Sequence, residues 1–138
     1  MHVLKCVLGI IFVVTMVGLT FSCAGQVEQT SILEGVVKIG PIWPVERPGE
    51  KPPVPLEVFE ARKIMVYDKN GDKLIETVNI IQIDQSQEGH YSVQLKPGIY
   101  VVDINRGGID HSSEVPKEVE LKAGLTVNLD IDIDTGIR

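Results

Sequence analysis

The stretch that decides the fold is Gly89-His90-Tyr91-Ser92-Val93-Gln94-Leu95-Lys96-Pro97-Gly98-Ile99-Tyr100-Val101-Val102. Apolar and polar residues alternate from Tyr91 to Leu95, and a second apolar row begins at Tyr100 and continues to Ile104. Such alternation is typical of strands with one buried and one wet face. Pro97-Gly98 supplies a turn between them, since proline presets φ and glycine tolerates the following bend. The stretch therefore predicts two consecutive strands.

The same period of two extends outward to both ends of the chain. Leu125 to Ile133 carries apolar residues at odd positions and polar ones at even positions, which predicts a last strand with a single buried face. Less regular strands are expected at 32–39, 62–68, 74–83 and 117–122. A helix of one or two turns is expected at 56–62. The sequence therefore predicts an all-β fold, an antiparallel β-sandwich of about seven strands.

One turn has a second interpretation. Lys69-Asn70-Gly71-Asp72 predicts a hairpin, because Asn and Gly tolerate positive φ. The segment from Asp68 also begins like a calcium loop, but a full loop needs glycine at its sixth position and glutamate at its twelfth. Those positions hold Lys73 and Asn79, so the hairpin is the preferred interpretation.

The stretch from Gly89 to Val102 resembles the G-x-Y-x-V-x-L-x-P-G-x-Y-x-V signature of carboxypeptidase-regulatory-like domains. Gly35-Val36-Val37 and Ile64 to Asp68 are similar to other strands of that family. The resemblance covers roughly residues 31 to 134 and implies a transthyretin-like (prealbumin-like) sandwich. In that family the module is usually non-catalytic. A related enzyme, 5-hydroxyisourate hydrolase, carries the motif Tyr-Arg-Gly-Ser at its end, where this chain has Thr-Gly-Ile-Arg. The motif is missing here, which disfavours that hydrolase activity.

The N-terminus reads as an export signal. Lys5 precedes an apolar run from Val7 to Leu19, and small residues follow. Leu19 to Cys23 resembles the lipobox of bacterial lipoproteins, although Thr20 and Phe21 depart from its usual pattern. This implies a signal peptide at 1–22, lipid attachment at Cys23, a tether at 23–30 and a sandwich at 31–138. Cleavage after Ala24 and an uncleaved anchor helix over the uncharged residues 6–27 remain alternatives.

Composition agrees with export. Cys6 and Cys23 are the only cysteines, and Cys6 would leave with the signal, so no disulfide is expected in the mature chain. The 13 basic and 19 acidic residues give a net charge of −6, which disfavours nucleic acid as a partner. The expected location is extracytoplasmic, at the outer membrane or cell surface, with secretion as the alternative.

Two loops are candidate binding segments. The segment 40–56 holds six of the eight prolines and the single tryptophan, Trp43. Trp43 is expected either to pack on the core or to form a partner-binding patch. The polar loop at 103–113 carries Arg106, Asp110 and His111 as weaker candidates for ligand contact. Its adjacent Asp, His and Ser do not predict a triad, because triads are assembled in space.

Three carboxylates form a further candidate site. Asp130, Asp132 and Asp134 alternate along the last strand, about 7 Å apart. A solvated acidic face is the preferred interpretation, and a divalent-metal site the alternative.

The resulting hypothesis is an exported, lipid-anchored, non-catalytic module with no cofactor. Its expected partners are the membrane, through its lipid, and an envelope protein or polysaccharide. The alternatives are a hydrolase or metal-binding protein using the 103–113 loop and the aspartate face, or a carrier of a small apolar ligand.

Overall fold

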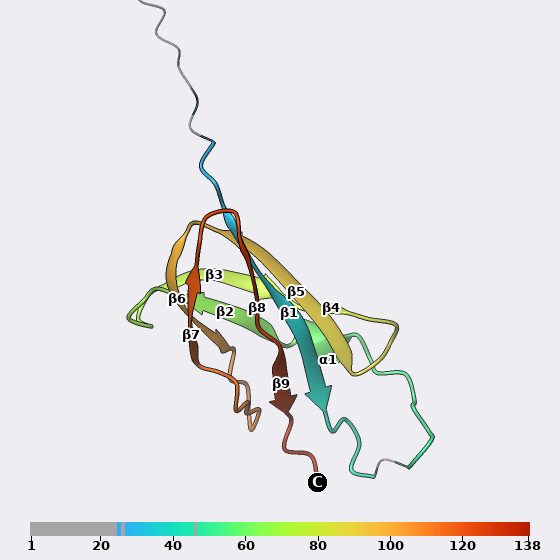
Figure 1. Ribbon diagram of the computed structural model, residues 1–138. Coiled ribbons are helices and arrows are strands. Elements are labelled where there is room, and N and C mark those ends of the chain that lie inside the picture. The colour runs from blue at the N-terminus through green and yellow to red at the C-terminus, as the bar shows by residue number, and fades with distance from the viewer. Residues whose placement is uncertain (1–24, 26, 46) are drawn as a thin grey trace, which may run out of the picture.

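The computed structural model describes residues 25, 27–45 and 47–138. Two sheets pack face to face and enclose the core (Figure 1). The first sheet has the order β4-β5-β1 with β8 and β9 on the far side of β1, and the second has the order β3-β2-β6-β7. The elements are β1 (Ser31–Gly40), α1 (Glu57–Glu60), β2 (Lys63–Tyr67), β3 (Leu74–Asn79), β4 (Ile81–Gln82), β5 (Glu88–Leu95), β6 (Gly98–Ile104), β7 (Lys117–Leu121), β8 (Thr126–Asn128) and β9 (Ile131–Asp134).

The all-β sandwich predicted from the sequence is confirmed, and so are its strands at Tyr91–Leu95 and Tyr100–Ile104, which fall in β5 and β6. The described residues form nine strands rather than about seven. The difference arises because two predicted strands are each divided: 74–83 into β3 and β4, and 125–133 into β8 and β9. The short helix expected at 56–62 is α1.

The sandwich is mainly antiparallel, as predicted, but the end of the chain departs from this pattern. β8 and β9 both run parallel to β1, whereas every other pairing is antiparallel. Alternation along one strand gives the buried face but carries no information on the direction of its neighbour. The buried face also begins later than predicted, since Leu125 is 56% exposed while Leu129, Ile131 and Ile133 are buried.

The break between β8 and β9 is filled by contacts from β1 and β5. The Leu129 amide donates to the Glu34 carbonyl at 2.8 Å, and the Val36 amide donates to Asp130 Oδ1 at 2.8 Å. The buried Tyr91 hydroxyl donates to the Leu129 carbonyl at 2.7 Å. Burial, and secondarily the Asp130 carboxylate, raise the pKa of Tyr91, so this hydroxyl remains a donor. Gly35 faces the same carbonyl, and a Cβ there would lie 2.0 Å from Leu129 O.

The core lies between the sheets and continues under α1. Its fully buried members include Leu33, Phe59, Ile64, Tyr91 and Ile133. Phe59 reaches the core from α1, so the helix closes one end of the sandwich. The hairpin between β2 and β3 needs no ion: Asp68 Oδ1 accepts hydrogen bonds from the Asp72 and Lys73 amides, and these bonds lower the pKa of Asp68.

The predicted signal peptide and Cys23, the predicted site of lipid attachment, lie outside the described residues. The tether enters the described structure at Gly25 and, from Val27, runs exposed into β1. The described residues contain no helix that is long and apolar enough to cross a bilayer.

Candidate functional site

Strand β1 runs between two opposite ends of the sandwich. The tether enters at its first residue, and the proline-rich segment leaves from its last (Figure 1). The loop before β5 lies at this second end, because Glu88 pairs with Lys38 near the end of β1. The loop between β6 and β7 also lies there, because His111 bridges Asp134, which pairs with Gly40. We call this the loop end; the tether lies at the opposite end of the sandwich.

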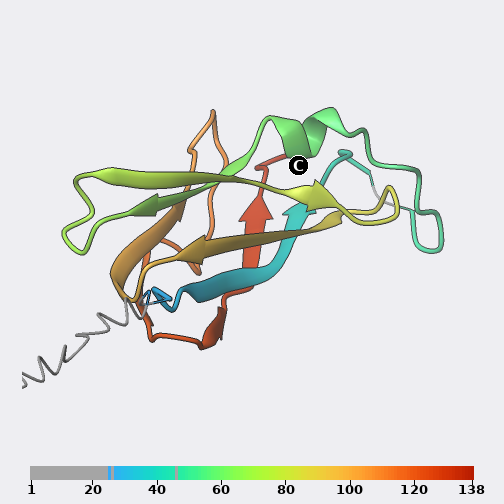
Figure 2. The same cartoon turned by 90° about the horizontal axis from the view of Figure 1, so that it is seen from above.

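The proline-rich segment is fixed at its start and near its finish. At the start, the Thr135 amide donates to Gly40 O at 3.1 Å, and the Thr135 hydroxyl donates to the Pro41 carbonyl. Near the finish, the buried Val54 donates its amide to Gln85 O at 2.8 Å. The Gln82 side-chain amide donates to Val54 O at 2.9 Å and to Ser86 O at 3.1 Å. These bonds hold the segment beside the turn between β4 and β5 (Figure 2).

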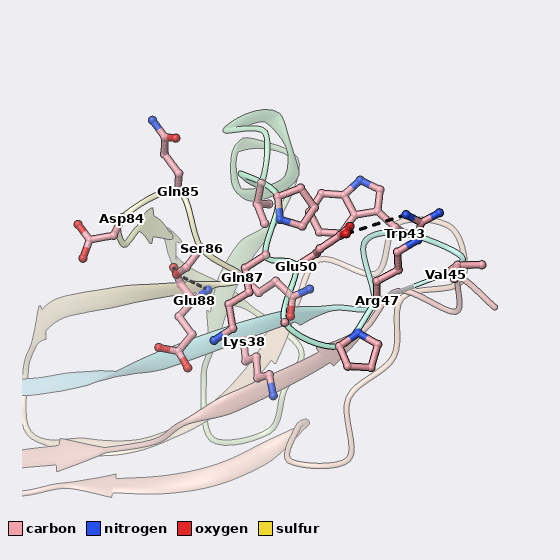
Figure 3. A pocket seen from close by; sticks show the side chains of 15 residues that line it. Lys38, Trp43, Val45, Arg47, Glu50, Asp84, Gln85, Ser86, Gln87 and Glu88 are labelled. Atoms are coloured by element: carbon pink, nitrogen blue, oxygen red, sulfur yellow. Dashed lines mark hydrogen bonds and ion pairs between the residues drawn. The ribbon is translucent and has the colours of Figure 1, made fainter.

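An open groove of about 860 Å³ lies between the proline-rich segment and this turn (Figure 3). This volume falls in the range of ordinary ligand sites. Trp43 is half-buried, packs against the core and also lines the groove. The two roles considered for Trp43 are therefore compatible in this structure. The lining residues are Lys38, Trp43, Val45, Arg47, Pro48, Gly49, Glu50, Lys51, Pro52, Val54 and 84–88.

The turn at 83–86 has a backbone that ordinary residues rarely adopt. Asp84 and Gln85 have φ angles of 48° and 52°, and the Ser86 amide closes the turn onto Ile83 O at 2.9 Å. Residues other than glycine are strained in this left-handed region of backbone conformation. The sequence does not predict this turn as part of a site, because the turn contains no glycine or proline. The polar run Asp84-Gln85-Ser86-Gln87 was the available signal.

The candidates of the 103–113 loop are separated rather than brought together. Arg106 pairs with Asp103 at 3.1 Å and donates to Val115 O at 3.3 Å. His111 is exposed and exchanges backbone hydrogen bonds with Asp134. Neither side chain lines the groove.

Asp110 has a structural partner. Arg62, at the end of the helical segment, places Nη2 3.0 Å from Asp110 Oδ1 as a hydrogen bond. Arg62 Nε lies 2.8 Å from Asp110 Oδ2. This contact is an ion pair, but its angle is not that of a hydrogen bond. The two side chains are 17% and 9% exposed. This pair fastens the 103–113 loop to the segment that follows α1.

The aspartate row also divides into separate interactions. Asp130 accepts the Val36 amide, as described above, and Asp134 pairs with Arg138 at 2.9 Å. Asp132 is exposed, opposite Lys38 of β1. No group of three or more histidine, cysteine, aspartate or glutamate side chains in the described part of the chain could hold a metal ion.

Glu114 organises the loop that precedes β7. Its two carboxylate oxygens accept hydrogen bonds from the Ser112 and Ser113 hydroxyls, both at 2.8 Å. The Asp132 amide of β9 lies 3.4 Å from Glu114 Oε2. The Ser112 hydroxyl thus donates to a carboxylate two residues away, an arrangement different from a nucleophile facing a base. The serine hydroxyls are the main reason that the pKa of Glu114 is lowered.

These carboxylates predict an acid-sensitive loop end. Hydrogen bonds from Arg138 lower the pKa of Asp134 from 3.8 to about 2, and the pKa of Glu114 falls below its ordinary 4.5. A pKa lowered by folding adds stability above the unfolded value, and this contribution is lost as pH falls through the folded value. We expect urea-unfolding midpoints to be constant from pH 7 to about 5 and to fall from about 4.5 to about 2. The Glu114→Gln variant should show a shallower fall, and an unchanged slope would contradict the assignment of Glu114.

Comparisons with known proteins assign no family to this chain. No protein-family model matches the chain, so the carboxypeptidase-regulatory-like resemblance rests on the motif alone. No curated protein matches it either. Among solved structures, the chain is similar to the crystal structure of GBS52, the minor pilin of the Gram-positive pathogen Streptococcus agalactiae. The match has 18% identity and a TM-score of 0.45, and covers 77% of this chain but only 44% of the pilin chain.

Proposed function

We propose that this protein is an exported, lipid-anchored, non-catalytic module that presents its loop end for binding or structural interaction in the cell envelope. Lipid attachment at Cys23 and extracytoplasmic location are parts of this proposal. The supporting observation is that the tether and the proline-rich segment lie at opposite ends of β1 (Figure 1), with the groove beside that segment. At about 3.3 Å per residue, the ten residues of β1 span about 30 Å.

The opposed geometry gives each end one task. A lipid at Cys23 would hold the tether end against a bilayer, and the groove would face away from it at the far end. The described residues of the tether make few contacts with the sandwich: Glu28 forms an exposed ion pair with Lys96 at 3.2 Å, which adds little stability, and Thr30 O accepts the Gly124 amide at 3.1 Å.

The hydrolase alternative requires convergence of a histidine with acidic groups in one cleft. In the described structure His111 and Asp110 lie on the 103–113 loop with different partners, and the groove contains neither. His90 lies exposed on the outer face of β5. These placements favour the binding module.

The anchor is tested by the intact mass of the protein purified from the native membrane fraction. We expect a mass equal to residues 23–138 plus lipid. A Cys23→Ala variant should lose the lipid mass, whereas Cys6→Ala is the matched control and should keep it, because Cys6 lies in the removed segment.

Two results would contradict the proposal. A chain that begins at Gly25 without lipid would show a freely secreted protein. A chain that keeps Met1 and fractionates with cytoplasmic proteins would show that it is not exported.

A further inference from the structure

We propose that the groove between the proline-rich segment and the β4–β5 turn binds a stretch of uncharged polysaccharide. This inference rests on the proposed function and names the partner of the same loop end. Trp43 and the polar residues on both walls of the groove are its basis (Figure 3).

The charges of the groove favour a neutral ligand. Its described lining residues include three basic side chains, Lys38, Arg47 and Lys51, and three acidic ones, Glu50, Asp84 and Glu88. Two opposite-charge pairs are already adjacent: Arg47 lies 3.9 Å from Glu50, and Lys38 is the cross-strand partner of Glu88. A balanced surface gives no net attraction to an anionic or cationic polymer.

The side chains provide the two kinds of contact that a sugar ring requires. The C–H groups of a pyranose ring are weakly positive and suit the negative face of an indole, and Trp43 lines the groove. Ring hydroxyls need planar polar groups that donate or accept two hydrogen bonds. Arg47 and Glu50 supply such groups on the proline-rich wall, and Gln87 supplies one on the wall that the turn forms.

The shape favours a polymer segment over a small buried ligand. The groove is open to solvent, with the proline-rich segment on one side and the turn on the other; Figure 3 shows the side chains of Asp84 and Gln85 pointing away from the proline-rich segment. Prolines restrict the first wall, and the bonds at Val54 hold it to the second. A preorganised site loses less entropy when it binds.

A peptide fits the groove less well. Peptides that add to a sheet need an unpaired strand edge, but Lys38 and Glu88 already pair with each other, and Ile39 N donates to Gln87 O at 2.9 Å. Peptides that bind through side chains need apolar pockets. Val54 is 4% exposed and belongs to the core, which leaves Trp43, Val45, Pro48 and Pro52, all on the proline-rich wall.

Trp43 makes the test direct because it is the only tryptophan in the chain. The full-length protein, in a detergent without a sugar headgroup, is titrated with cellohexaose, maltohexaose and N-acetylated chitohexaose while Trp43 fluorescence is recorded. Oligogalacturonate and a polyproline peptide serve as charged and peptide comparators. We expect a saturable change with at least one neutral sugar. Its Kd should change less than about twofold between about 50 and 500 mM salt, since no charge is neutralised.

Variants locate the site. Calorimetry should show binding at least about tenfold weaker for Trp43→Ala, the size expected for a lost aromatic stack. Because Trp43 also packs against the core, Glu50→Ala provides a second variant in an exposed position. Glu50→Ala should weaken binding several-fold and leave the unfolding midpoint unchanged. Glu28→Ala, which removes a similarly exposed ion pair at the tether end, is the matched control and should bind like the parent.

The inference is overturned if none of the neutral sugars gives a saturable change, or if only oligogalacturonate or the polyproline peptide binds. It is also overturned if Glu50→Ala and Glu28→Ala bind equally well. None of these results affects the mass of the membrane-derived chain, so failure of the groove and failure of the anchor are distinguishable.

Discussion

Replacing Gly35 with alanine should cost this protein a large part of its stability. The added Cβ would lie 2.0 Å from the Leu129 carbonyl oxygen and 2.6 Å from its carbon, and both are backbone atoms. Leu129 has little freedom to move, because its amide bonds to Glu34 and its carbonyl accepts the Tyr91 hydroxyl. Relief of the clash therefore breaks a buried hydrogen bond as well as the packing of β8 and β9 against β1.

We expect Gly35→Ala to cost about 3 kcal/mol or more. For a domain of this size the melting temperature would fall by roughly 12 °C or more. Thermal unfolding followed by circular dichroism measures this loss. Gly107→Ala is the matched control, since a Cβ there meets nothing within 4 Å and the position needs no positive φ. If the two variants melt at similar temperatures, the backbone of Gly35 does not lie as close to Leu129 as described here.

Removing the Asp110 carboxylate should have the second largest effect. Asp110→Ala leaves the Arg62 side chain, 17% exposed, with the Val58 carbonyl as its one remaining partner among the described residues. Loss of one member of a buried ion pair costs 3–5 kcal/mol. Because solvent reaches this pair in part, we expect about 2–3 kcal/mol here. Urea unfolding at neutral pH gives the value.

Two controls separate the pair from its surroundings. Arg106→Ala removes an exposed ion pair of the same loop and should cost less than about 1 kcal/mol. The double variant Arg62→Leu, Asp110→Ala should be more stable than Asp110→Ala alone, since no unpaired charge remains. Asp110 was first considered as a ligand contact. An Asp110→Ala variant with full stability but altered ligand binding would restore that role.

The sequence predicted the local structure well and the long-range structure less well. Alternation identified the strands, and turn residues such as Pro97-Gly98 and Asn70-Gly71 separated them, because both signals depend on nearby residues. The parallel pairing of β1 with β8 and β9 depends on how the chain returns after β7. The division between them depends on Asp130, whose carboxylate accepts the Val36 amide where the ladder is interrupted. Neither effect has a local signature.

The sequence predicted one wall of the candidate site but not the other. Prolines and a single tryptophan drew attention to residues 40–56, which form one wall of the groove. The opposite wall was missed because Asp84 and Gln85 adopt positive φ without glycine. The residues of the 103–113 loop are candidates because of their polar and charged side chains. The role of Asp110, however, is set by its ion pair with Arg62, forty-eight positions earlier in the chain.

The placement of β1 also determines how the protein would bear tension. A pull between an anchored tether and a ligand held in the groove would run along β1, which carries the tether at one end and the proline-rich segment at the other. β1 pairs with β5 at eight positions and with β8 and β9 at three and four. These ladders lie alongside the line of force, so their hydrogen bonds would be sheared together instead of opening one at a time. How long the protein withstands such a pull then depends on its unfolding rate under force. The central position of β1 gives this small sandwich the geometry of a mechanical link.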